Sequence, residues 1–251
     1  MKGVQIFTHS LRQVLNNLPA ALRISGVLYL VQVAVSLAFG RAMMSAGMGG
    51  MMGGGYGIGA LVVMLVSLIT GIWIAVAWHR YVLLSEQPTT PVPPFMGERM
   101  GSYFIKSLLI GIVLLVMGMV LGMIVGVVAM PLMTHGAGLI ALLLFSLLVQ
   151  VPMIFLGLRM AAALPGTALG TNHPLITGWE ATEGEWRPLL QLAIIMALAV
   201  WVVQLIGLFV FGGVTLLAQL WQVVTGWPIM MVGLSILTTL YGHYIEKRPL
   251  V

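Results

Sequence analysis

Long apolar runs, separated by short polar segments, extend along the whole chain and define most of the predicted elements. A helix of about 20 residues, rising about 1.5 Å per residue, crosses a hydrocarbon core about 30 Å thick. We predict six membrane-spanning helices, at residues 24–39, 60–78, 108–130, 139–158, 189–211 and 228–244. The sequence lacks the segments of alternating polarity, roughly ten residues long, that are typical of membrane β-barrels. The predicted fold class is therefore all-α: a polytopic integral membrane protein with one transmembrane domain over residues 1–251.

The N-terminal segment has a different, amphipathic pattern. Lys2 and Arg12 lie off a helical face whose apolar residues recur at intervals of three or four. That face consists of Val4, Phe7, Leu11, Val14, Leu15 and Leu18. We predict an interfacial helix at residues 4–18 that lies on the membrane surface and ends near Pro19.

The connections between the spans differ in composition. Residues 40–59 are rich in glycine and methionine, which predicts a flexible external loop. Residues 85–101 contain four prolines and predict an extended connector. In the last apolar stretch, Pro228 is predicted to separate an external interfacial segment, which contains Trp221 and Trp227, from the sixth span.

The longest polar interval, residues 159–190, lies between the fourth and fifth spans. Leu175, Ile176 and Trp179 would share one side of a helix, so we predict a short cytoplasmic helix that ends near Thr182. Its apolar side is expected to lie on the membrane or on the cytoplasmic ends of the spans.

The distribution of charge predicts the orientation. With the N-terminus inside, ten of the eleven Lys and Arg residues lie in cytoplasmic segments, and only Arg41 lies outside. This is the positive-inside pattern, so both termini are expected in the cytoplasm. The residues before the first apolar run are not those of a signal peptide, which predicts a retained first span. Because the basic residues are scattered, the formal charge of +5 does not indicate a nucleic-acid partner.

The amino-acid composition excludes several kinds of catalytic and metal-binding site. The chain has no cysteine and no aspartate, which removes thiol chemistry and many carboxylate metal sites. We predict no catalytic residue and no cofactor, and hence no enzymatic activity. The external loop offers one weak alternative, because methionine thioethers suit Cu(I). The candidate ligands are Met43, Met44, Met48, Met51 and Met52.

Small and polar residues within the spans predict contacts between helices. Glycines on the third span form a GxxxGxxxG pattern that lets another helix approach closely. The helix-packing candidates are Gly111, Gly118, Gly122 and Gly126. Amides inside the membrane usually form hydrogen bonds between helices, although they could instead line a polar path. The three intramembrane amides are Gln32, Gln150 and Gln204.

The polar interval also contains the densest acidic group, Glu180, Glu183 and Glu185. These glutamates could bind a basic partner, or they could simply be solvated.

Residues in this interval and at the N-terminus resemble a broad group of bacterial six-span proteins. The motif residues of the interval are Arg159, Leu164, Pro165, Ala168, Trp179, Thr182, Gly184, Trp186 and Leu189, and those of the N-terminus are Ser10, Leu11, Arg12 and Asn17. The group includes the membrane domain of some glycerophosphodiester phosphodiesterases and stand-alone relatives of that domain. The chain departs from it at Gly178, where serine is usual, and it lacks the soluble catalytic domain. The resemblance implies a multi-pass protein of the bacterial inner membrane, and it implies no activity.

These observations lead to two hypotheses of function. The first is a non-catalytic accessory or scaffolding subunit that associates with the lipid bilayer and with other membrane proteins. The alternative is a transporter or permease for a small molecule.

Overall fold

The computed structural model describes residues 2–45, 56–134, 138–212 and 214–250. Helices dominate these residues, which contain no β-strand. Six helices are long and apolar enough to cross a membrane, so the all-α polytopic fold is confirmed. They are α2 (Leu18–Ser45), α3 (Tyr56–Leu84), α4 (Gly97–Thr134), α5 (Gly138–Ala161), α8 (Trp186–Phe211) and α9 (Thr215–Leu240), and a π-helical turn at Tyr241–Ile245 continues α9.

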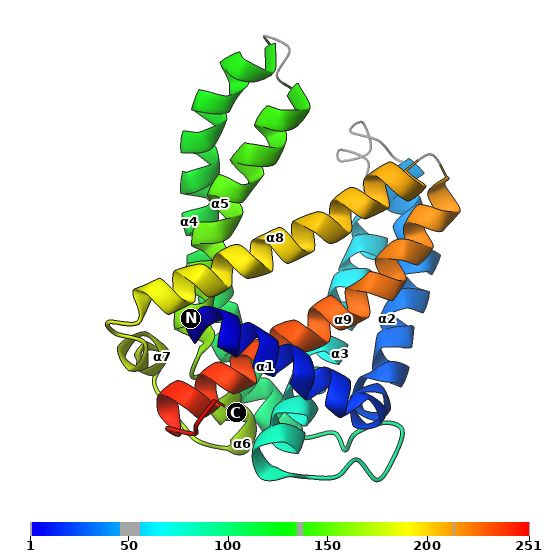
Figure 1. The fold of residues 1–251 in the computed structure, drawn as a ribbon. Coiled ribbons are helices and arrows are strands. Elements are labelled where there is room, and N and C mark those ends of the chain that lie inside the picture. The colour runs from blue at the N-terminus through cyan, green and yellow to red at the C-terminus, as the bar shows by residue number, and fades with distance from the viewer. Residues whose placement is uncertain (1, 46–55, 135–137, 213, 251) are drawn as a thin grey trace.

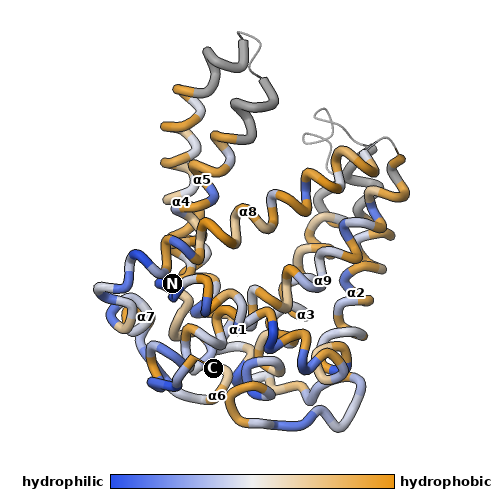
Figure 2. Tube along the Cα trace, in the orientation of Figure 1, coloured by the Kyte–Doolittle hydropathy of each residue, from blue (hydrophilic) through white to orange (hydrophobic). Residues whose placement is uncertain are grey.

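The long helices form two arms that rise from a common base (Figure 1). One arm is the α4–α5 hairpin. The other contains α2 and α3 together with the ends of α8 and α9 that are joined to each other. The base contains both termini, the N-terminal helix α1 (Lys2–Asn16) and two short helices, α6 (Leu164–Leu169) and α7 (Ile176–Ala181). Most hydrophilic residues gather at this base, whereas the arms are mainly hydrophobic (Figure 2).

The base also contains most of the buried core. One cluster joins α1, α5, α8 and α9 around Ile6, Leu192 and Leu240, which are fully buried. A second joins α3, α4 and α6, and a third joins α1, α2, α3 and α9 around Trp78. By contrast, no residue of α4 from 111 to 128 is buried. The fold is therefore consolidated at the base, and its arms expose apolar side chains.

Helix α1 confirms the predicted N-terminal helix and adds a face that the apolar pattern did not indicate. Gly3, Ile6, Ser10 and Val14 are buried on the side that packs against α8 and α9. Most of the predicted apolar stripe lies beside this face and is half-buried or exposed; Leu15, for example, is 58% exposed. Helix α1 therefore packs against the protein with one side and leaves most of the neighbouring apolar side half-buried or exposed.

Several predicted boundaries are wrong because the helices extend further than the apolar runs. Helix α2 begins at Leu18, since proline is well tolerated in a first helical turn, as Pro19 is here. Of the predicted loop 40–59, residues up to Ser45 belong to α2 and residues from Tyr56 belong to α3. The connector has no regular secondary structure from residue 85 to residue 96, and α4 already begins at Gly97.

The predicted break at Pro228 is also wrong. Helix α9 runs from Thr215 through this proline without interruption, so the preceding residues do not form a separate interfacial segment. A proline inside a membrane helix is tolerated where neighbouring groups bond the backbone around it. Pro228 leaves the carbonyl of Val224 without its helical donor. In the same part of α9, the Tyr29 hydroxyl donates to the carbonyl of Val223 at 2.7 Å, and the Thr225 hydroxyl donates to the carbonyl of Trp221 at 2.7 Å.

Candidate functional site

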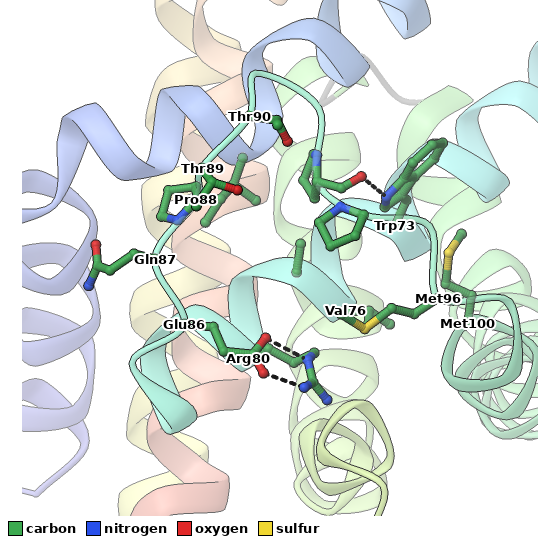
Figure 3. Close-up of a pocket in the computed structure, with 14 residues that line it drawn as sticks. Trp73, Val76, Arg80, Glu86, Gln87, Pro88, Thr89, Thr90, Met96 and Met100 are labelled. Carbon is green, nitrogen blue, oxygen red and sulfur yellow. Dashed lines mark hydrogen bonds and ion pairs between the residues drawn. The ribbon is translucent and has the colours of Figure 1, made fainter.

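The proline-rich connector closes a small cavity against α3 and α4 at the base of the molecule (Figure 3). Its apolar wall includes Trp73, Val76 and Met100. The Trp73 indole donates to the carbonyl of Pro93 at 3.2 Å and meets the ring of Phe95 edge to face. The tryptophan therefore anchors the connector to α3.

The charged side chains at the rim of this cavity neutralise each other. The Arg80 guanidinium donates to both carboxylate oxygens of Glu86, and its remaining nitrogen donates to the carbonyl of Ala168 at 3.0 Å. Such a bidentate pair uses the donors that would otherwise bind an anionic ligand. The cavity has a volume of about 100 Å³, whereas pockets for small molecules usually have about 300–1,000 Å³. We conclude that this region fastens the connector and α6 to α3.

A buried polar triad lies near the base and joins three spans. His79 on α3 has no exposed surface; its Nδ1 lies 2.8 Å from the Thr238 hydroxyl on α9, and its Nε2 lies 3.2 Å from the Tyr103 hydroxyl on α4. The apolar pattern of the sequence did not indicate these contacts of His79. The boundary predicted for the second span, residue 78, excluded His79, but α3 continues to Leu84.

The hydrogen bonds fix the tautomer of His79. The Thr238 hydroxyl donates its only hydrogen to the carbonyl of Leu234 at 2.8 Å, so it accepts from His79 Nδ1–H. Nε2 of the neutral imidazole must then accept from the Tyr103 O–H. Every polar hydrogen of the triad is donated to another group of the protein. The arrangement is therefore suited to fixing α3, α4 and α9 to one another.

The polar interval 159–190 packs onto the base through Arg159. Its guanidinium donates to the Thr182 hydroxyl and to the carbonyl of Trp179, both at 3.1 Å, and lies 3.7 Å from the centre of the Trp179 ring. A guanidinium over an indole face is a favourable cation–π arrangement. Arg159 therefore holds α7 against the end of α5.

The short helix predicted between the fourth and fifth spans is confirmed as α7. Its buried residue is Gly178, where a Cβ would lie 2.6 Å from the carbonyl oxygen of Arg159. Ile176 and Trp179, which were expected on the membrane or on the ends of the spans, are 54% and 38% exposed. The apolar pattern missed this contact because a glycine provides no apolar signal. Helix α6, also missed, lies between Arg159 and α7.

The three candidate glutamates do not act as one group. Glu185 forms an ion pair with Lys2 at 2.7 Å, which joins the N-terminus to the start of α8. Glu180 and Glu183 are exposed, and neither has a partner among the residues that the structure describes. Only this second pair is available to another molecule.

The glycines of α4 divide in a similar way. A Cβ at Gly118 would lie 3.3 Å from the Met153 side chain of α5, so this glycine packs within the hairpin. A Cβ at Gly111, Gly122 or Gly126 would meet no described atom within 4 Å. Among the described residues, nothing covers these three positions.

The intramembrane amides lie on different helix pairs. Gln32 on α2 donates to the Thr70 hydroxyl on α3 at 2.7 Å. Gln222 on α9 donates to Gln204 on α8 at 2.9 Å. Gln150, on α5, is half-buried and has no hydrogen bond to the described residues. Two of the three amides therefore join neighbouring helices.

The candidate copper ligands lie largely outside the described residues. Met48, Met51 and Met52 lie outside the described residues, and only the backbone of Met43 and Met44 is described. Elsewhere in the described chain, no group of three or more His, Asp or Glu residues could hold a metal ion.

Comparisons with protein-family models, with curated proteins and with solved structures gave no match. The architecture alone therefore defines the class of this chain. It is an all-α, multi-pass membrane protein with a consolidated polar base and two apolar arms.

Proposed function

We propose that this chain is a non-catalytic accessory or scaffolding protein that associates laterally with other membrane proteins and lipids through its arms. The exposure of α4 carries this proposal. Only 6% of its membrane-spanning segment is buried, the least of the six spans. Beyond the base, α4 contacts α5 with one narrow side, formed by Leu114, Gly118, Leu121 and Val125. The remaining surface is free for neighbours in the membrane.

The exposed surface of α4 is not used for packing within the described protein, and this supports the proposal. Lipid tails solvate apolar side chains well, so membrane helices associate through close packing of small residues and through polar bonds. Gly122 and Gly126 offer such a close approach next to the side that α5 covers. An accessory subunit can therefore bind a second protein here without rearrangement of its own fold.

The orientation follows from the same distribution of residues. We place the polar base in the cytoplasm and the arms in a bacterial inner membrane, because the basic residues gather at the end with both termini. Reporter fusions after Thr90 and Leu175 should score as cytoplasmic, and a fusion after Val214 should score as external. A reversal of these results would contradict the proposed orientation.

The main test compares Gly122→Leu with Gly26→Leu. Both replacements place a branched side chain where a Cβ meets no described atom within 4 Å, so both isolated proteins should keep their thermal stability. After purification in mild detergent, Gly122→Leu should lose a stoichiometric membrane partner that the wild type and Gly26→Leu retain. Retention of that partner by both variants would contradict a role for the α4 face.

The exposed glutamates provide a second test on the cytoplasmic side. Glu180→Gln combined with Glu183→Gln should weaken association with a basic partner at low salt and leave the fold intact, since neither side chain has an internal partner. Association that is unchanged at both low and raised salt would show that this pair is only solvated.

A further inference from the structure

An apolar groove lies between α8 and α9, and α1 borders it on a third side. It has a volume of about 220 Å³, and its walls include Phe7 and Leu11 from α1, Val200 from α8, and Ile229 and Gly233 from α9. The two long helices meet at their outer end, where a Cβ at Gly207 would lie 2.6 Å from the Trp221 ring. Towards the base they separate, and α1 packs against both of them. The groove therefore forms where α1 packs against the two helices as they separate.

The lining of the groove suits a hydrocarbon chain. Its one side-chain hydroxyl, that of Thr225, already donates to the carbonyl of Trp221. Ala199 and Pro228, which also line the groove, are exposed, so one side opens onto the membrane-facing surface. The volume is below the roughly 300–1,000 Å³ of pockets that enclose a whole small molecule. The groove can hold a segment of an acyl chain while the rest of the lipid stays in the bilayer.

The residue that follows Leu11 supplies a headgroup contact. Arg12 is exposed, and it has no ion pair or hydrogen bond with the residues that the structure describes. Along α1 the polar side begins at Thr8 and Arg12, next to the exposed Val4 and Leu15. A guanidinium at the boundary between the apolar and polar sides of an interfacial helix can reach a lipid phosphate.

We propose that the groove between α1, α8 and α9 binds one acyl chain of an anionic phospholipid whose headgroup is held by Arg12. The two parts have different roles: the groove selects for a chain, and the arginine favours a net negative headgroup over a zwitterionic one. The proposal does not rest on the accessory function, because it concerns the purified chain alone.

The chain-binding part is tested by filling the groove. A Cβ at Gly233 would meet no atom within 4 Å, so Gly233→Leu places its side chain in the empty groove. Gly26→Leu is the matched control, on α2 and away from the groove. Ala199→Phe fills the groove from the opposite wall, and it replaces the first variant if that protein does not fold.

The assay measures thermal stabilisation, and lipid binding by native mass spectrometry, with added phosphatidylglycerol or phosphatidylcholine. For the wild type, phosphatidylglycerol should bind roughly fivefold more tightly, as expected from one basic residue near an anionic headgroup. Arg12→Gln should remove this preference and keep weak binding of both lipids, whereas Lys247→Gln should preserve it. The groove-filling variant should lose binding of both lipids. Equal wild-type binding of the two lipids, or wild-type binding by the groove-filling variant, would overturn the proposal.

Discussion

Replacement of His79 by phenylalanine should destabilise the protein by removing the hydrogen bonds that join α3, α4 and α9. Phenylalanine is larger than histidine by one ring atom, so the replacement opens no cavity; the loss comes from the polar groups, with crowding of the enclosed site in addition. The Thr238 hydroxyl keeps its bond to the carbonyl of Leu234. The Tyr103 hydroxyl belongs to a residue only 4% exposed, and it would lose its partner.

Two values could describe the loss of folding free energy in His79→Phe. A hydrogen bond between membrane helices contributes about 0.6 kcal/mol on average, because the separated helices find other partners. A buried polar group that is left without a partner costs about 1–3 kcal/mol. The second value should apply, since Tyr103 is enclosed by protein and cannot reach a replacement partner. For a protein of this size each kcal/mol lowers the melting temperature by roughly 2–4 °C, so we expect a decrease of roughly 2–12 °C.

The assay is thermal unfolding of the purified variants in one mild detergent at one scan rate. The informative comparison is His79→Phe with the double variant that also carries Tyr103→Phe. Since the second change removes the unpaired hydroxyl, the double variant should be no less stable than the single one. A single variant as stable as the wild type, or a double variant whose loss is the sum of the two single losses, would refute this reasoning.

Two other predictions concern the base. Gly178→Ala should cost about 1–3 kcal/mol, because its Cβ would lie 2.6 Å from the backbone oxygen of Arg159; Gly101→Ala, where no atom lies within 4 Å, should not destabilise. Equal melting temperatures of Gly178→Ala and Gly101→Ala would show that α7 can shift freely. Replacement of Glu185 by glutamine should cost at most about 1 kcal/mol, because its ion pair with Lys2 is about one-third exposed. This difference should vanish in high salt, and a larger, salt-independent loss would contradict it.

The sequence predicted the spans well because their signal is local and strong. Each run of apolar residues identifies a helix without knowledge of its neighbours, and the amphipathic spacing does the same for α1. The errors at the boundaries have a common cause. Glycine, proline and polar residues often end a helix in water, but in this fold α9 continues through Pro228, and α3 includes His79, whose ring nitrogens are bonded by neighbouring helices.

The contacts of the candidate sites could not be predicted, because they depend on which helices meet. Neither the partners of His79 nor the close contact of Gly178 with Arg159 has a pattern in the sequence. The glutamates illustrate the same limit. Their density was evident, but the pairing of Glu185 with Lys2 joins residues 183 positions apart.

The division between base and arms has a physical reason. Polar groups in a membrane protein must find partners within the protein, and each such pair fixes the helices that carry it. The base contains these pairs: Trp78 donates to Ser235 at 2.9 Å, and the hydroxyls of Ser10 and Thr239 are hydrogen-bonded to each other at 2.9 Å. The apolar arms gain little from packing on one another, because lipid solvates them equally well. It follows that substitutions at the base should act on stability, whereas substitutions on the exposed face of α4 should act on association and leave the isolated protein intact.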